Sequence, residues 1–240
     1  MARVTTTSST RAACSPDLWH HYGRNRADTD RSVPDSFHSV WAQDGGPGVE
    51  VLGDITGLVV ADLGAGAARH AAHLAARHAP ARVDAVDASP AQHAMARDLY
   101  GHLTPRRRTV HADAVELLDA HPGSYDVLYS VFGSLDFTDP RRLLPAAARA
   151  LRPGGLLAAS TLGHYLDGAP AEPDVQHADL PARTPDGATA TMRRWVLQET
   201  VWTEQLDGAG FTAVSIDRLP SAAPGARTAE TLLIRAYRRS

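Results

Sequence analysis

An apolar run that ends at once in two glycines is the feature that most limits how this chain can fold. Residues 58–63 read as a buried strand, the turn Gly64-Ala65-Gly66 follows, and residues 67–78 have a helical composition. The same pattern predicts further strands at residues 83–86, 109–112, 125–129, 155–161, 213–219 and 231–237. Strands that alternate with helices at this spacing predict an α/β fold, a parallel sheet with helices on both faces.

Local signals mark where the helices between these strands begin and end. Ser89 and Pro90 are a good N-cap and first-turn pair, so a helix is expected from there to about Tyr100. A second helix is expected over residues 141–151, where a Pro-Gly pair follows, and a third near residues 201–209.

Two segments interrupt the alternation and define the expected domain organisation. Residues 1–14 have no apolar core and read as a flexible tail. Residues 15–52 are aromatic and are split by proline and glycine, which predicts an N-terminal cap of short helices. Residues 53–240 then form one domain, and the segment at about 163–194, rich in Pro, Gly and Asp, is expected to be an insertion at one edge of the sheet.

Composition excludes several classes of function. All 24 positive charges are arginine, so the lysine of P-loop enzymes, a Schiff-base lysine and the Tyr-x-x-x-Lys pair of short-chain dehydrogenases are absent. The single cysteine, Cys14, cannot form an internal disulfide, which favours a reducing compartment and a cytoplasmic location. A net charge of −3 gives no signal for nucleic acid, and no apolar stretch approaches the roughly 20 residues of a membrane helix.

The residues that follow the first two strands indicate a nucleoside ligand. Gly64 and Gly66 allow a tight turn and a close approach of backbone to ligand. Asp87 lies 21 residues beyond Gly66, where a carboxylate can accept hydrogen bonds from two ribose hydroxyls. Arg69 stands where a dinucleotide motif needs its third glycine, and Asp62 would repel a diphosphate but can orient a cationic amino-acid group. S-adenosylmethionine fits these requirements, because it carries an ammonium and a sulfonium and has no phosphate.

Five short motifs then stand in order along the chain: VVADLGAG at 59–66, VDAS at 86–89, HADA at 111–114, YDVLYS at 125–130 and LRPGG at 151–155. Together they resemble the ordered motifs of the class I S-adenosylmethionine-dependent methyltransferases, over about residues 58–161. The resemblance implies a Rossmann-like, seven-stranded, mostly parallel sheet with an N-terminal helical cap, and S-adenosylmethionine as the cofactor.

The resemblance also implies roles for individual positions. The glycine turn would hold the methionine part, Asp87 the ribose and Asp113 the adenine amino group, while Ser130 would lie beside the methionine moiety. The implied cofactor-binding positions in this domain are Asp62, Gly64, Ala65, Gly66, Asp87, Ala88, Asp113, Ala114 and Ser130. Ala68 stands where the family usually has a third glycine, and alanine is small enough to keep the close approach.

A helix expected from about Asp17 adds a further candidate element. Trp19, Tyr22 and Arg26 are spaced i, i+3 and i+7, so they would share one face. In similar methyltransferases such a helix folds over the cofactor, which would place Tyr22 near the sulfonium and Arg26 on the carboxylate. The alternative is that the aromatic residues pack the helix against the core.

Candidates for the acceptor side come from the ends of the fourth and fifth strands. His164 and Tyr165 lie two to three residues past the fifth strand and are the catalytic candidates, with His164 as a general base or simply a polar loop residue. The candidates for acceptor binding are Trp41, Phe132, Asp136 and Trp195. No metal is expected, because the Asp-Asn pair that would complete a magnesium site is absent after the fifth strand.

These observations predict a methyltransferase acting on O, N or C of a small, moderately apolar metabolite in secondary metabolism. Its expected partner is that acceptor molecule, with no nucleic acid and no membrane, and the oligomeric state is left open. Three alternatives remain: a cofactor-binding enzyme that catalyses cyclisation or elimination, a non-catalytic cofactor-binding module, and a nucleic-acid methyltransferase, which would need a basic face.

Overall fold

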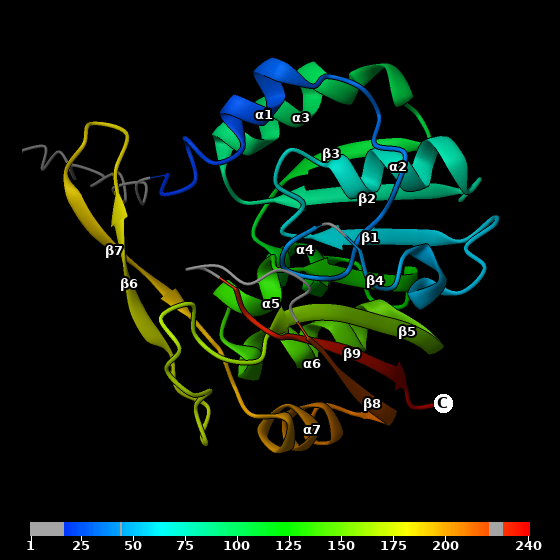
Figure 1. Ribbon diagram of the computed structural model, residues 1–240. Helices are drawn as coiled ribbons and strands as arrows, with labels where there is room; N and C mark the ends of the chain where they lie inside the picture. The colour runs from blue at the N-terminus through cyan, green and yellow to red at the C-terminus, as the bar shows by residue number, and fades with distance from the viewer. Residues whose placement is uncertain (1–16, 44, 221–227) are drawn as a thin grey trace, which may run out of the picture.

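A seven-stranded sheet forms the centre of the molecule (Figure 1). The computed structural model describes residues 17–43, 45–220 and 228–240, without the side chains of residues 25 and 26. The strands of the sheet are β1 (Val59–Leu63), β2 (Arg82–Asp87), β3 (Arg107–His111), β4 (Tyr125–Val131), β5 (Leu151–Leu162), β8 (Phe211–Leu219) and β9 (Thr231–Arg238). Their order is β3-β2-β1-β4-β5-β9-β8, and only β9 runs antiparallel to its neighbours. The predicted seven-stranded, mostly parallel sheet is therefore confirmed.

The central strands are apolar on both sides because helices cover both faces of the sheet. Val60 of β1 lies in register with Val83 of β2 and Val127 of β4, and all three side chains face the same layer of helices. Ala61 and Leu63 face the opposite layer. This two-sided burial is why the strands read as near-continuous apolar runs in the sequence.

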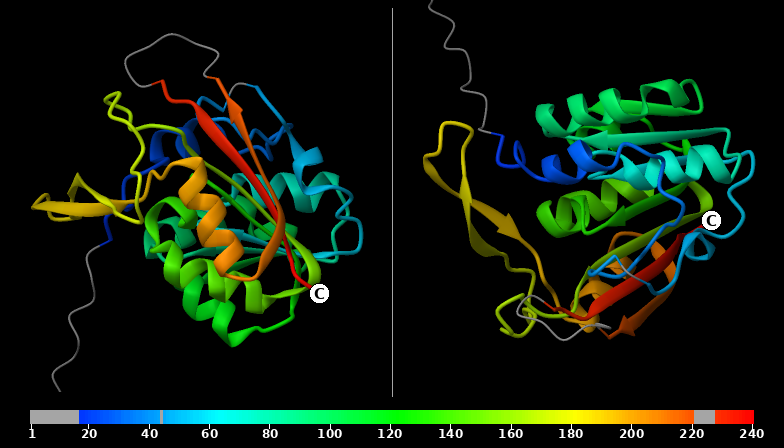
Figure 2. Two further views of the ribbon diagram at one scale, coloured as in Figure 1. Left: turned by 90° about the horizontal axis from the view of Figure 1, so that it is seen from below. Right: turned by 45° about the horizontal axis from the view of Figure 1, so that its top comes forward.

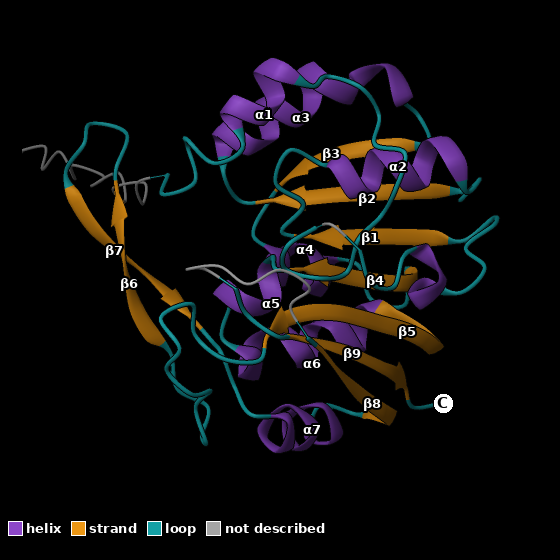
Figure 3. Ribbon diagram, viewed as in Figure 1, coloured by secondary structure: helices purple, strands orange, loops and turns teal. Residues whose placement is uncertain are grey.

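The helices divide between the two faces of the sheet (Figure 3). They are α1 (Arg24–Thr29), α2 (Arg69–Arg77), α3 (Pro90–Tyr100), α4 (Ala114–Ala120), α5 (Ser134–Phe137), α6 (Pro140–Ala150) and α7 (Glu199–Gly208), with the 3-10 turns η1 (Val49–Leu52) and η2 (Gly101–Leu103). Helices α4, α6 and α7 pack in one core layer, and α2 packs with η1 in the other. No helix in the described ranges is long and apolar enough to cross a membrane.

Capping residues start the helices that lead away from the site. Ser89 caps α3 by accepting a 3.1 Å hydrogen bond from the Gln92 amide, with Pro90 in the first turn as predicted. Asp139 caps α6 in the same way through the Arg141 amide. The short helices α4 and α5 were not predicted from the sequence, because two turns or fewer carry little periodic signal.

The N-terminal segment is less helical than expected. Residues 17–23 form turns, with the Tyr22 amide bonded to the Trp19 carbonyl at 3.0 Å, and the first helix begins only at Arg24. The expectation of a helix from Asp17 is therefore wrong, although the Trp19 and Tyr22 rings do lie together, 5.6 Å apart and edge to face. The expected tail at residues 1–14 lies outside the described residues, and the division at residue 52 stays a prediction.

A β-hairpin occupies the expected insertion. Strands β6 (Ala178–Arg183) and β7 (Thr189–Arg194) pair antiparallel, with Leu180 opposite Met192, and extend away from the main sheet (Figures 1 and 2). The sequence predicted an insertion here but not its hairpin, since Pro, Gly and Asp mask the alternation of the two strands.

Candidate active site

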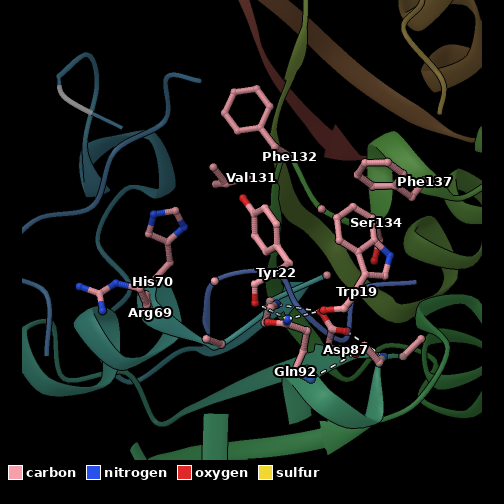
Figure 4. Close-up of a pocket in the computed structure, with 18 of the residues that line it drawn as sticks. Trp19, Tyr22, Arg69, His70, Asp87, Gln92, Val131, Phe132, Ser134 and Phe137 are labelled. Atoms are coloured by element: carbon pink, nitrogen blue, oxygen red, sulfur yellow. Dashed lines mark hydrogen bonds between the residues drawn. The ribbon is translucent and has the colours of Figure 1, made fainter. Parts of the chain in front are cut away.

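A cavity of about 970 Å³ opens at the carboxyl ends of β1, β2 and β4 (Figure 4). Ligands bind at this end of open α/β sheets, and this is where the sequence placed its candidate residues. The predicted positions that line the cavity are Tyr22, Trp41, Gly64, Ala65, Gly66, Asp87, Ala88, Asp113, Ala114 and Phe132.

The glycine turn after β1 lies directly against the loop after β4. Gly64 has φ +77°, and a Cβ atom there would lie 2.4 Å from the Ser134 nitrogen and 2.7 Å from the Gly133 Cα. Gly133 is equally confined, because its Cβ would lie 2.5 Å from the Leu63 carbonyl oxygen. A side chain at either glycine would separate the two loops that form the floor of the cavity.

Asp87 connects the end of β2 to the glycine turn. Its Oδ2 accepts a 2.7 Å hydrogen bond from the Gly66 amide, and its Oδ1 accepts a 2.9 Å bond from the Ser89 amide. Burial raises the pKa of Asp87, while these two amides act in the opposite direction. Each carboxylate oxygen can accept more than one hydrogen bond, so Asp87 keeps acceptor capacity toward the cavity for a pair of hydroxyl groups.

Asp113 lies beyond β3 at the same side of the cavity. Its Oδ1 accepts hydrogen bonds from the Val115 and Glu116 amides, at 2.8 and 3.2 Å, and so caps α4. The small side chains of Ala88 and Ala114 line the cavity nearby. Asp113 thus has a structural role as a cap in addition to its position at the cavity.

Two predicted cofactor positions do not line the cavity. The Ser130 hydroxyl donates to the Leu63 carbonyl at 2.9 Å and accepts from the Leu135 amide at 3.2 Å, so it joins β4 to β1 inside the protein. Asp62 is buried near Tyr129, and this burial raises its pKa to about 7. Neither side chain is placed to contact a ligand in the cavity.

Residues 17–22, here named the N-terminal strap, line the cavity and are anchored to the start of α3. Asp17 Oδ2 accepts bonds from the Ser89 hydroxyl and the Ala91 amide, at 2.9 and 3.1 Å. Gln92 Nε2 donates to the carbonyls of Trp19 and Tyr22, at 2.9 and 2.8 Å. The strap lines the cavity as turns and not as a helix, and its expected role in folding over a bound cofactor stays a prediction. The Arg26 side chain is outside the described part of the structure.

Aromatic rings line the part of the cavity away from Asp87 (Figure 4). The Trp19 ring lies 4.7 Å from the Phe137 ring, and the Trp41 ring lies 5.0 Å from the Phe132 ring, both edge to face. Phe132 has φ +49°, a left-handed conformation that is costly for an aromatic residue. Arg194 lies between two of these rings, with its Cζ 5.3 Å from the Trp41 centroid and 5.1 Å from the Phe137 centroid.

The two catalytic candidates do not line the cavity, although Tyr165 packs behind Trp41 and Phe132. His164 Nδ1 bonds the Tyr165 carbonyl oxygen at 2.8 Å, and its Nε2 accepts from the Glu230 amide at 3.3 Å. An Nε2 that accepts has no proton, so this geometry fits a neutral ring that holds the backbone together. The Tyr165 hydroxyl donates to Glu172 at 3.2 Å, and burial raises the pKa of Tyr165 to about 12. These positions do not support the expected catalytic roles.

Two of the acceptor-binding candidates are also core residues. Trp195 is 5% exposed and packs in the layer of α6 and α7. Asp136 is fully buried and accepts hydrogen bonds from Nε and Nη2 of Arg194, at 3.1 and 2.5 Å. Neither lines the cavity, whereas Trp41 and Phe132 do. No cluster of three or more potential metal-ligating side chains occurs among the described residues.

Sequence reasoning missed several residues that line the cavity. They are Gln92, Gly133, Ser134, Phe137 and Arg194. Gly133 and Ser134 directly follow β4, so the rule that ligands bind beyond strand ends could have found them. Arg194 gave no signal, because its partner Asp136 is 58 residues away in the sequence.

Comparisons with known proteins agree with this geometry. Residues 60–155 match the model of a methyltransferase domain family. No curated protein matches the sequence. Among solved structures, an S-adenosylmethionine-dependent methyltransferase from Mesorhizobium loti is 22% identical, with a TM-score of 0.54 and coverage of 78% of this chain and 94% of the other.

Two further structures illustrate the range of this fold. The 1,6-didemethyltoxoflavin N1-methyltransferase of Burkholderia thailandensis, solved with its substrate and S-adenosylhomocysteine, is 25% identical with a TM-score of 0.52, and the match covers 77% of this chain and 72% of the other. The [4+2]-cyclase SpnF is 16% identical with a TM-score of 0.64 and 93% coverage of both chains. Residues 60–155 thus match a methyltransferase domain family, and the strand order and the glycine turn give the chain the Rossmann-like fold of the class I S-adenosylmethionine-dependent methyltransferases.

Proposed function

We propose that this protein transfers the methyl group of S-adenosylmethionine to O, N or C of a small, moderately apolar metabolite. The observation that carries the proposal is the unit formed by Asp87 and the Gly66 amide, 2.7 Å apart at the cavity. A carboxylate held by a glycine turn at the end of β2 suits a ribose with two free hydroxyls. S-adenosylmethionine is the cofactor that this arrangement and the match to a methyltransferase domain favour.

The residues present fit that cofactor. Gly64 and Gly66 leave the backbone open where a Cβ would fill the turn, and Asp87 keeps acceptor capacity on both oxygens. Gln92 lines the cavity and holds residues 17–22 through its bonds to the Trp19 and Tyr22 carbonyls.

The chain's own residues then act mainly by positioning. When bound, S-adenosylmethionine supplies a methyl group activated by its sulfonium. Asp87 and the glycine turn would hold the nucleoside end, with the strap beside it on the cavity wall. Aligning two reactants can supply about 7–11 kcal/mol, whereas a placed base contributes about 10²–10⁴ in rate. A site without His164 as its base is therefore compatible with methyl transfer.

Three features favour a small acceptor over a macromolecule. The cavity is bounded by the strap and the β6–β7 hairpin, and its outer part is aromatic. The net charge of −3 gives no electrostatic attraction for nucleic acid.

One cysteine in 240 residues fits a cytoplasmic location. A role in secondary metabolism is part of the proposal, because tailoring enzymes act on acceptors of this size and polarity.

The test combines binding and turnover. S-adenosylhomocysteine is titrated calorimetrically into the protein, and cofactor labelled in its methyl group is then incubated with protein and an extract of the source organism. The proposal expects binding and a labelled small molecule that is soluble in organic solvent. Label in nucleic acid, or binding without label in any product, would contradict methyl transfer to a metabolite. Substrate conversion with the label left on the cofactor would instead favour cyclase or lyase chemistry.

A further inference from the structure

Arg194 is a buried cation at the aromatic end of the cavity. It ends strand β7 of the hairpin, is 5% exposed and lines the cavity. Its Nε and Nη2 donate to Asp136, while its guanidinium plane lies against the rings of Trp41 and Phe137. A guanidinium bonded along one edge to a carboxylate and packed on two aromatic rings has a fixed orientation.

The remaining edge of this guanidinium has no protein acceptor. Within the described residues, every hydrogen bond of Arg194 runs from Nε or Nη2, so the two N–H groups of Nη1 have none. Nη1 is not among the fully buried side-chain atoms that lack a partner, so it is accessible. The accessible space that Arg194 lines is the cavity. Two fixed donors thus face the cavity.

The charge around Arg194 decides which kind of acceptor these donors can bind. Asp136 is fully buried and neutralises the guanidinium. Of the other lining arginines, Arg69 is paired with Asp30, and Arg24 is exposed at the cavity mouth. A second carboxylate beside Asp136 would therefore be a buried charge without a counter-ion, which is expensive. An uncharged oxygen gains the hydrogen bond without that cost.

We propose that Nη1 of Arg194 recognises an uncharged carbonyl oxygen on a planar acceptor, which makes Arg194 a specificity-determining residue. The inference rests on the proposed function and narrows its acceptor class. The rings of Trp41, Phe132 and Phe137 line the cavity around Arg194 and offer apolar surface to a flat ring system, with its carbonyl bound where the hairpin meets the cavity. Leu180 and Met192, paired across the hairpin, line the same side.

Three bicyclic probes of similar size test this inference. Indolin-2-one carries a carbonyl, indole lacks it, and indole-2-carboxylate is anionic. Each is titrated by ligand-observed NMR into protein saturated with S-adenosylhomocysteine. Wild type is expected to bind indolin-2-one about tenfold more tightly than indole, as one hydrogen bond to a charged donor provides. Indole-2-carboxylate is expected to bind more weakly than indolin-2-one.

The variants separate recognition from folding. Arg194→Met alone leaves Asp136 as an unpaired buried charge, so the test uses the double variant Arg194→Met/Asp136→Asn. Its preference for indolin-2-one over indole should fall to about one. Arg193→Met is the matched control, because Arg193 is exposed on the opposite face of β7 and should keep the wild-type preference.

Each result has one interpretation. The inference is overturned if wild type binds indolin-2-one and indole equally, if indole-2-carboxylate binds best, or if the double variant keeps the preference. It is also overturned if no probe binds at 10 mM, roughly the weakest affinity that fragments of this size show. S-adenosylhomocysteine affinity is measured on the same samples. Failure of wild type to bind it removes the proposed function itself, whereas normal binding without a carbonyl preference removes only this inference.

Discussion

The Gly66 amide donates a 2.7 Å hydrogen bond to Oδ2 of Asp87, so the turn after β1 and the carboxylate after β2 form one unit. The two residues are 21 positions apart, and each depends on the other. Without the carboxylate the turn loses an acceptor, and without the turn the carboxylate loses the amide that orients it. The predictions below test the parts of the site that surround this unit.

Substitution of the two glycines should have unequal costs. Gly66→Ala places its Cβ 3.5 Å from Gln92 Oε1, so there is room for it, and the left-handed backbone costs about 1–2 kcal/mol. Alanine at Gly64 adds a clash with the Gly133-Ser134 backbone, so at least about 3 kcal/mol is expected. Denaturant unfolding of Gly64→Ala and Gly66→Ala measures both. Equal losses would show that the close packing of the two loops is not needed.

Ala68 is left-handed, with φ +60°, where the family usually has glycine. The methyl group is fully buried, so Ala68→Gly loses about 0.8 kcal/mol of burial but relieves about 1–2 kcal/mol of backbone strain. Unfolding free energies should therefore stay within about 1 kcal/mol of wild type. The control Ala72→Gly, equally buried but inside α2, should lose about 2 kcal/mol. If both variants lose the same, Ala68 is not strained.

Asp62 predicts a dependence of stability on pH. Burial raises its folded-state pKa to about 7, above the ordinary value of 3.8, so the folded state binds the proton more tightly than the unfolded state. This contribution to stability is complete below about pH 4 and is lost as the pH rises to about 7, with an upper bound of about 4 kcal/mol. Asp62→Asn removes it.

The measurement for Asp62 is the unfolding free energy of wild type and Asp62→Asn at pH 5 and pH 8, without ligand. The unfolding free energy of Asp62→Asn relative to that of wild type should be higher at pH 8 than at pH 5, by at least about 1 kcal/mol. A difference between the two proteins that does not change with pH would show that Asp62 is ionised throughout this range.

Gln92 is expected to keep the N-terminal strap closed. Gln92→Leu removes both bonds to the carbonyls of Trp19 and Tyr22 at similar side-chain volume, which is worth about 1 kcal/mol for each bond. Amide hydrogen exchange in residues 17–22 should become faster, and S-adenosylhomocysteine should bind about tenfold more weakly. Gln205→Leu on α7 is the control. Unchanged exchange in the strap would mean that other contacts hold it.

The sequence was sufficient for the parts of the fold that depend on local patterns. The buried strands and the Ser89-Pro90 start of α3 follow from apolar runs and capping chemistry within a few residues. The glycine turn and the carboxylate of Asp87 could be located for the same reason, since each directly ends a strand. These features place the cavity at the correct edge of the sheet.

What could not be predicted depends on contacts between distant segments. The ion pair of Asp136 and Arg194 joins α5 to the hairpin, and neither element has enough periodicity to be seen in the sequence. His164 has the chemistry of a base, but only the fold reveals that backbone groups occupy both ring nitrogens. Ser130 is the expected residue at the end of β4, yet its hydroxyl is used to join two strands.

The most direct test of the account is the affinity of S-adenosylhomocysteine for wild type and Asp87→Ala, measured by isothermal titration. The account predicts that wild type binds and that Asp87→Ala loses at least about 10²-fold, because two hydrogen bonds to a charged acceptor disappear. Asp98→Ala, which removes an exposed carboxylate on α3, should bind like wild type. Equal affinity of Asp87→Ala and wild type, or no binding by wild type, would contradict the assignment of this cavity to the cofactor.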